Sequence, residues 1–229
     1  MSAPPHLQIA IDGPAASGKT TVAHILAQRL RILYLDTGAM YRALAFLTLQ
    51  TRTDADNEAA LVHLCEAEHI TVRLDDGAPL GFRIFAGDHE LTERDLQSNA
   101  VTSIVSVVAA HPKVRGAMVA SQQRVARAGP VVMAGRDIGT VVLPNAQVKI
   151  FLTASAQARV DRRRAQLQEA GVDVNVHRLA EELEERDRLD RSRATAPLVP
   201  APDAHVIDSS AMTVEGVIDE IIAIVDRSR

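Results

Sequence analysis

The stretch GPAASGKT, residues Gly13–Thr20, carries the strongest indication of the fold of this chain. It matches the phosphate-binding pattern G-x-x-x-x-G-K-[ST] in full. The apolar run Leu7–Asp12 before it predicts a buried strand, and apolar residues recur at helical spacing from Val22 to Leu30 after it. A strand, a glycine-rich turn and a helix in this order are the context in which the pattern binds a nucleoside triphosphate.

The residue types in this loop suit a bound triphosphate and its metal ion. Glycine lets the backbone curl so that its N–H groups point at phosphate oxygens, and the start of the following helix favours negative charge. Lys19 can reach the β- and γ-phosphates, and the hydroxyl of Thr20 can ligate Mg²⁺. We therefore expect ATP with Mg²⁺ as the cofactor, a metal ligand at Thr20, and ATP contacts from Gly13, Pro14, Ala15, Ala16, Ser17, Gly18, Lys19, Thr20 and Thr21.

Four more short apolar runs follow, and helical segments separate them. They lie at Ile32–Asp36, Pro130–Gly135, Val148–Ala154 and His205–Ser210. Buried strands that alternate with helices predict a parallel sheet covered on both faces. The expected fold class is therefore α/β: a three-layer P-loop NTPase fold with a five-stranded parallel sheet.

The region around residues 68–92 breaks this rhythm. Thr71–Leu91 alternates in short segments with Asp-Gly and Gly-Asp turns, which predicts a small antiparallel β-insertion. Two helices are expected after it, at about 93–110 and 112–128, and Pro112 suits the first turn of the second.

Bulk composition limits the partners. The net charge of −4 gives no basic field for nucleic acid, and the 3% of aromatic residues offer no row of stacking side chains. Cys65 is the only cysteine, so no intramolecular disulfide is possible. No apolar run reaches the length of a membrane span, and no charged-then-apolar signal precedes the first strand. We expect no nucleic acid or membrane partner and a cytoplasmic location.

Arginines at the predicted ligand edge of the sheet are candidates for binding phosphate. Arg136 and Asp137 directly follow a buried strand, and Arg42 follows another, where Thr37 could cap a helix. On position alone, each is also compatible with a surface or strand-end ion pair.

Two helical segments carry further arginines. In the first, Arg186, Asp190 and Arg193 fall on one helical face and could meet phosphate and ribose together. In the second, one helical surface carries Arg159, Arg162 and Arg163, which could form a second phosphate clamp. Weak ion pairs on solvated helix faces are the alternative for both segments.

Four stretches together resemble bacterial cytidylate kinases: AIDGPAASGKTT (10–21), YLDTGAMYRALA (34–45), VMAGRDIGTVVLPNAQVKIFLTAS (132–155) and ERDRLDRSRATAPLVPAPDAHVIDSS (185–210). The resemblance spans nearly the whole chain, and GRDIGTVV and RDRLDRSR are its specific parts. It implies transfer of the γ-phosphoryl group of ATP to CMP or dCMP by a monomer. It also implies one kinase domain over 1–229, with a monophosphate-binding region at 37–115 and a helical lid at 155–193.

The resemblance also implies roles for single residues. Asp137, Ser106 and Arg115 would read cytosine, with Ser103 as a nearby competitor of Ser106. The remaining CMP contacts would come from Thr37, Tyr41, Arg42, Arg136, Arg186, Asp190 and Arg193. Arg162 and Arg163 would close over ATP. The expected catalytic residues are Lys19, Arg136, Arg162 and Arg193.

An ionised Asp137 would accept a hydrogen bond from the cytosine amine and repel the uracil carbonyl at the same position. An unpaired polar contact of this kind costs about 1–3 kcal/mol, which predicts roughly 10- to 100-fold preference for CMP over UMP. The alternatives are a kinase for UMP, AMP or another small acceptor, and a nucleotide-hydrolysing switch or nucleic-acid-binding module. No Asn-Lys-x-Asp or Leu-Ser-Gly-Gly motif supports a GTPase or a transporter ATPase.

Overall fold

The computed structural model describes residues 6–75, 78, 82–169 and 171–228. Its centre is a sheet of five strands in the order β2-β6-β1-β7-β8, and every neighbouring pair runs parallel. The strands are β1 (Gln8–Asp12), β2 (Leu33–Asp36), β6 (Val131–Gly135), β7 (Val148–Thr153) and β8 (His205–Asp208). All five predicted strands are confirmed, and most are one or two residues shorter than expected.

The register of the sheet places polar residues of separate strands at one edge. Asp12 at the end of β1 pairs with Gly135 of β6, and Asp36 at the end of β2 pairs with Ala134. Because the strands are parallel, everything that follows them emerges on the same side. This edge is where open parallel sheets bind ligands.

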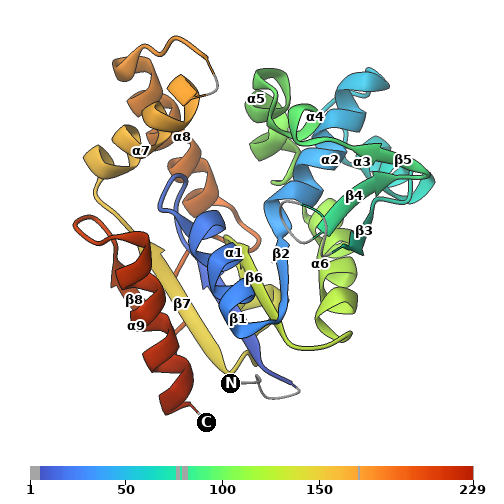
Figure 1. Cartoon of the computed structure of the whole chain (residues 1–229). Coiled ribbons are helices and arrows are strands. Elements are labelled where there is room, and N and C mark those ends of the chain that lie inside the picture. Colours follow the sequence, from blue (N-terminus) through green and yellow to red (C-terminus); the bar gives the residue numbers. More distant parts are fainter. Residues whose placement is uncertain (1–5, 76–77, 79–81, 170, 229) are drawn as a thin grey trace.

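Helices cover the sheet and bury its apolar strands. Helix α1 (Lys19–Leu30) packs against β6 and against α9 (Val214–Arg227), as Figure 1 shows. A short π-helix, η1 (Ile138–Val142), follows β6 and packs against α6 (Pro112–Ala126). The largest fully buried side chains include Ile9, Ile11, Leu35, Met133 and Ile150 of the strands. Their near-continuous apolar character is typical of a parallel sheet buried on both faces.

A second group of elements lies beyond the ligand edge, between β2 and β6 in sequence (Figure 1). It consists of α2 (Thr37–Gln50), α3 (Glu58–Ala67), β3 (Thr71–Leu74), β4 (Phe82–Ala86), β5 (His89–Leu91), α4 (Glu93–Gln97) and α5 (Asn99–Val108). The three strands form the predicted antiparallel insertion. Gly87 makes the β4–β5 turn in the left-handed region with φ 56°, whereas the predicted Asp76–Gly77 turn lies outside the described residues.

The prediction of one continuous helix over 93–110 is wrong. Thr92 and Asp95 form a capping box that starts α4, and the helix ends at Gln97. Ser98 then takes an extended conformation, and its hydroxyl accepts a hydrogen bond from the N–H of Val101 to start α5. A serine that caps a helix in this way competes with continuation of the preceding one.

Helices α7 (Ala156–Glu169) and α8 (Val176–Ser192) form a helical pair that stands opposite α2, α4 and α5 across the ligand edge (Figure 1). Val160, Leu179 and Leu183 form a small apolar cluster in this pair, separate from the main core. Among the described residues, no helix is both long enough and apolar enough to cross a membrane.

Gly13 is the residue where the main chain turns from β1 into the phosphate loop. Its φ of 150° lies in the region that favours glycine, and a Cβ built there would lie 2.0 Å from the main-chain oxygen of Leu152. Since a neighbouring strand cannot retreat, we expect Gly13→Ala to lower the free energy of unfolding by at least about 2 kcal/mol. Denaturant unfolding measures this.

The matched control is Gly116→Ala in α6. A Cβ at Gly116 would meet no atom within 4 Å, so this change should raise the stability by about 0.5–1 kcal/mol. Equal effects of the two substitutions would contradict the close approach at Gly13.

Candidate active site

A cavity of about 760 Å³ opens at the ligand edge, between the helical pair α7–α8 and helices α2, α4 and α5. Its lining includes the phosphate loop, the ends of β2 and β6, and side chains from both helical groups. The predicted site residues along its wall are Ala15, Ala16, Gly18, Lys19, Thr20, Thr21, Thr37, Tyr41, Arg42, Ser106, Arg115, Arg136, Asp137, Arg163, Arg186, Asp190 and Arg193. Residues from six separate stretches of sequence therefore share one cavity.

The phosphate loop curls as its motif requires. Gly18 has φ 94°, and Ala16 takes the left-handed region with φ 57°. Lys19 is 8% exposed, and its ammonium donates to the main-chain oxygen of Pro14 at 2.6 Å. Burial, and next to it the charge of Arg136, hold the pKa of Lys19 well below its ordinary value. The negative charges of Asp36 and Asp12 offset only part of this effect.

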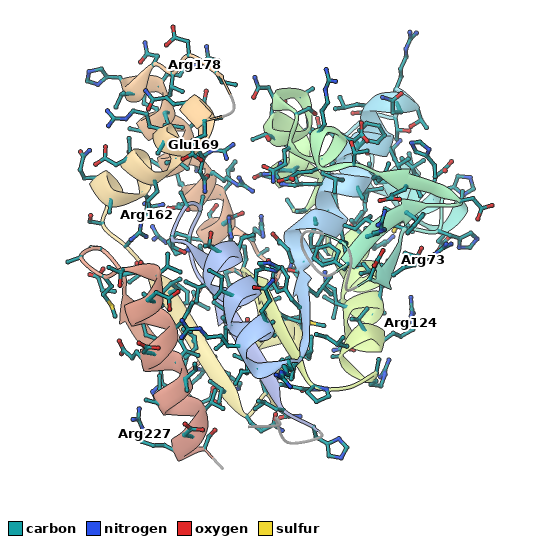
Figure 2. All side chains as sticks on the ribbon, in the orientation of Figure 1. Arg73, Arg124, Arg162, Glu169, Arg178 and Arg227 are labelled. Atoms are coloured by element: carbon teal, nitrogen blue, oxygen red, sulfur yellow. The ribbon has the colours of Figure 1, made fainter. Side chains whose placement is uncertain are left out.

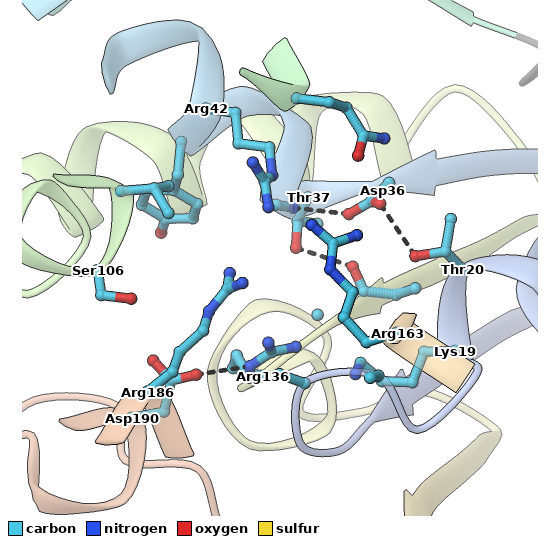
Figure 3. Close-up of a pocket in the computed structure, with 18 of the residues that line it drawn as sticks. Lys19, Thr20, Asp36, Thr37, Arg42, Ser106, Arg136, Arg163, Arg186 and Asp190 are labelled. Carbon is cyan, nitrogen blue, oxygen red and sulfur yellow. Dashed lines mark hydrogen bonds and ion pairs between the residues drawn. The ribbon is translucent and has the colours of Figure 1, made fainter. Parts of the chain in front are cut away.

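A carboxylate lies beside the loop hydroxyl that was expected to bind metal. The hydroxyl of Thr20 donates to Oδ2 of Asp36 at 3.2 Å (Figure 3). The other oxygen of Asp36 accepts from the N–H of Gly38 and so caps α2. The prediction that Thr37 caps this helix is wrong: Thr37 is the first helical residue, and its hydroxyl donates to the main-chain oxygen of Ala134 at 2.9 Å.

Neighbouring strands hold the segment that carries Arg136 and Asp137. Thr37, after β2, bonds the end of β6 as described. Asp12, at the end of β1, accepts the N–H groups of Ile138 and Gly139, one on each carboxylate oxygen, both at 2.7 Å. Arg136 and Asp137, which lie between these anchor points, therefore have a fixed direction into the cavity.

Asp137 forms a buried ion pair with Arg115 of α6, and the two residues are 4% and 3% exposed. Arg115 also donates to the main-chain oxygen of Ala109 and lies 5.4 Å from the ring centre of Tyr41. Ser106 faces this part of the cavity, whereas Ser103 is exposed and donates to the oxygen of Ala100. The structure therefore favours Ser106 over Ser103 as a cavity residue.

Asp190 of α8 lies between two arginines. It pairs with Arg136 at 2.7 Å and with Arg193. Burial would raise the pKa of Asp190, but the two guanidinium groups outweigh burial and hold the pKa below its ordinary value. Arg193 itself lies outside the helix, in an extended conformation after Ser192, so the predicted single helical face is wrong at its last member although the ion pair exists.

Positive charge remains in excess around the cavity. Figure 3 shows Arg42, Arg136, Arg163 and Arg186 reaching it from four different elements. Burial, then repulsion by Arg136 and Arg42, lower the pKa of Arg186 to about 9. Its Nε is buried and has no hydrogen-bond partner among the described residues. Since buried cations are costly without counter-charges, this cavity suits a ligand with several negative charges.

The three arginines of α7 do not form one clamp, so that prediction is wrong. Arg159 pairs with Asp187 of α8, and Arg163 lines the main cavity. Arg162, labelled in Figure 2, donates to the main-chain oxygen of Ser17 at 3.1 Å and to the hydroxyl of Ser209 at 3.0 Å. Residues three and four apart on a helix need not share one partner when the surfaces around them differ.

Arg162 instead lines a second cavity of about 420 Å³ on the other side of the phosphate loop. The loop contributes Ser17, Gly18 and Thr21 to it. The remaining wall comes from α7 and from the segment between β8 and α9, and includes Ser209, Met212 and Thr213. Gly18 and Thr21 line both cavities, so the two meet at the phosphate loop.

The family model for cytidylate kinase matches residues 9–227, which is nearly the whole chain. The chain belongs to the cytidylate kinase family. It is 49% identical to a cytidylate kinase of Enterococcus faecalis, over 94% of this chain and 93% of that protein. It is 47% identical to a cytidylate kinase of Pelotomaculum thermopropionicum, over 96% of each.

A solved structure of an uncharacterised protein from Eubacterium ventriosum has a similar fold, with a TM-score of 0.50 at 12% identity over 96% of this chain and 98% of that one. At this identity, the likeness concerns the fold alone.

Sequence patterns missed three features of this cytidylate kinase family member. Asp36 lies within the DTGAMYR stretch, yet only the fold brings its carboxylate to Thr20. Asp12 reads as the last residue of a strand, and its two main-chain partners lie 126 and 127 positions away. The second cavity depends on the β8–α9 segment, which carries no charged motif beside Ser209. A search for polar residues at strand ends would have found the first two.

Asp12 provides a test of the anchored segment. Burial raises the pKa of Asp12 from 3.8 to about 6, although the bonds from Gly139 and Ile138 lower it. The folded state therefore holds a proton at about pH 5 that the unfolded state has lost, and the wild type loses stability as the pH rises to about 7. Asp12→Asn lacks this titration. The free energy of unfolding of the variant, relative to that of the wild type, should therefore rise by about 1.4 kcal/mol between about pH 5 and pH 7.

Asp203→Asn is the control, because Asp203 is an exposed carboxylate with a lowered pKa. It stays ionised in both states over the same pH range, so its stability difference should stay flat. A flat difference for Asp12→Asn as well would contradict the raised pKa.

Proposed function

We propose that this chain transfers the γ-phosphoryl group of ATP to CMP or dCMP, giving ADP and CDP or dCDP. The observation that carries the proposal is the cluster of buried cations at the point where the two cavities meet. One cavity continues from the phosphate loop toward the β8–α9 segment, and the other ends at the buried pair of Asp137 and Arg115. Two nucleotides can therefore meet phosphate to phosphate at Lys19.

ATP would place its triphosphate along the loop and its base in the smaller cavity, near Met212 and Thr213. Lys19 would exchange the oxygen of Pro14 for phosphate oxygens, and Arg162 and Arg163 would contact the nucleotide from α7. This use of main-chain N–H groups, a lysine and a helix start follows the chemistry of phosphate loops.

Mg²⁺ fits the residues at the end of β2. Thr20 and Asp36 offer a hydroxyl and a carboxylate beside the loop, and hard oxygen ligands are what Mg²⁺ prefers. In the described part of the chain, no three acidic, histidine or cysteine side chains come together, which agrees with an ion that keeps several waters and binds substrate phosphates. Mg²⁺ held there would neutralise negative charge that develops on the phosphates.

CMP would lie in the larger cavity. Its phosphate would face Arg42, Arg136, Arg186 and Arg193, and its ribose would face Asp190. Asp137, Arg115 and Ser106 would contact the cytosine, beside Thr37 and Tyr41. The carboxylate of Asp137, which pairs with Arg115 in the free protein, would accept the cytosine amine and repel the uracil carbonyl.

The protein residues need supply little covalent chemistry for this reaction. Lys19, Arg136, Arg162 and Arg193 would hold the two phosphates in line and place positive charge where the transferring group develops negative charge. The free protein already holds these cations, so they need little reorganisation when the substrates arrive. Segment 37–115 would bind the monophosphate, and 155–193 would act as a lid, within one kinase domain over 1–229. The protein would act as a monomer in the cytoplasm.

A coupled ADP-release assay tests the proposal with ATP·Mg²⁺ and CMP, dCMP, UMP or AMP in turn. CMP and dCMP should give the highest kcat/KM, and chelation of Mg²⁺ should abolish the signal. A higher kcat/KM for UMP or AMP would indicate another monophosphate kinase. ADP release at the same rate without any acceptor would indicate a hydrolysing switch.

A further inference from the structure

Two charged residues of the helical pair α7–α8 form hydrogen bonds with the main chain of the phosphate loop at Ala15. Oδ1 of Asp187 accepts the N–H of Ala15 at 3.1 Å. Arg159 donates to the main-chain oxygen of Ala15 at 3.2 Å and pairs with the other oxygen of Asp187. Both main-chain polar groups of one loop residue are therefore bonded to this Asp187–Arg159 pair.

The surroundings of this pair are buried. Asp187 is 2% exposed and Ala15 is 4% exposed, and the side chain of Arg159 is 11% exposed. Ala15 packs into the same apolar cluster as Val160, Leu179 and Leu183. A buried charge pair is costly unless further hydrogen bonds satisfy its polar atoms, and Nε of Arg159 has no partner among the described residues. Here Ala15 provides part of that satisfaction, so the loop and the helical pair depend on each other.

The backbone conformation beside Ala15 requires support from the surrounding structure. Ala16, the next residue, has φ 57°, a conformation that is unfavourable for a residue with a side chain unless the surroundings enforce it. Ser17 and Gly18, which lead into helix α1, follow directly after it. Fixing Ala15 therefore fixes the direction of the groups that follow.

Neither Asp187 nor Arg159 lines either cavity, so neither is placed to touch a nucleotide. We propose that the Asp187–Arg159 pair is a positioning device, through which the helical pair α7–α8 holds the phosphate loop in its triphosphate-binding conformation. A change in the orientation of α7–α8 then changes the affinity for the donor nucleotide. The identity of that nucleotide rests on the proposed function; the coupling between the loop and the helices does not.

The test compares donor and acceptor affinities in Asp187→Ala, which removes both of the bonds that Asp187 makes. We expect the Kd for ADP and the KM for ATP to rise about tenfold, while the KM for CMP stays within about twofold of the wild type. Arg159→Gln should shift the donor affinity in the same direction. A double-mutant cycle should show that the two effects are not additive.

Glu185→Gln is the matched control. Glu185 lies on the same helix, two positions before Asp187, and the change breaks its exposed ion pair with Arg188. It should leave the Kd for ADP unchanged. If Asp187→Ala does not fold, the double variant Asp187→Ala/Arg159→Ala removes the pair and its bonds to Ala15 without leaving one buried charge alone, and it should show the same rise. Thermal unfolding of each variant separates affinity from stability.

Equal changes in the donor and acceptor constants, or a lower melting temperature with unchanged constants, would overturn the proposal, because a purely structural role predicts them. Failure of the proposed function looks different. The wild type would then bind ADP without phosphorylating CMP, while the selective effect of Asp187→Ala on ADP binding would still support the coupling.

Discussion

Replacing Lys19 with methionine is expected to lower kcat for CMP phosphorylation by about 10²- to 10³-fold, as measured by steady-state ADP release. Loss of one preorganised donor at the transferring group costs about this much. The stability of the variant should not fall along with its kcat. Because burial and Arg136 already disfavour the charged form of Lys19 in the free protein, the free energy of unfolding should stay the same or rise.

Lys113→Met is the control for Lys19→Met. Lys113 is exposed at the start of α6 and does not line the cavity, so Lys113→Met removes an equal charge outside the site. Its kcat should match the wild type. A near-normal kcat in Lys19→Met would show that Lys19 does not contribute to the reaction. A large loss of stability would contradict the conclusion that burial and Arg136 disfavour the charged form of Lys19.

Replacing Asp137 with asparagine is expected to reduce the preference for CMP over UMP by about 10- to 100-fold, measured as the ratio of the two kcat/KM values. The amide no longer repels the uracil carbonyl and can donate to it. It also leaves Arg115 without its buried counter-charge, and breaking a buried pair costs about 3–5 kcal/mol. Thermal unfolding with and without CMP should therefore accompany the kinetics.

Asp203→Asn makes the same chemical change at an exposed carboxylate that pairs with Lys149, away from the cavity. Its CMP-to-UMP ratio should equal that of the wild type. An unchanged ratio in Asp137→Asn, at temperatures where the variant is folded, would sink the role of Asp137 in reading the base.

Local patterns predicted much of the fold and of the site. The phosphate loop depends on nearby glycines and on the strand and helix beside it, and apolar runs report burial on both faces of a parallel strand. Arg42 and Arg136 could be chosen because parallel strands and their following segments emerge at one edge, and Arg186 because it shares a helical face with Asp190. Errors arose where one local signal had two outcomes. Ser98 can continue a helix or cap the next one. In the folded chain it caps α5, and α4 and α5 each pack against α2 on either side of the break.

The strand–loop–helix motif, the five parallel strands and the arginines at the ligand edge could be predicted from local sequence, because each depends on neighbours within a few residues. The pairing of those charges depends on the folded chain. The fold brought Asp36 to Thr20, divided Arg159, Arg162 and Arg163 among three surroundings, and set Asp187 against Ala15 across 172 positions. The strength of a charge pair depends on distance and burial, and chain order specifies neither for residues so far apart.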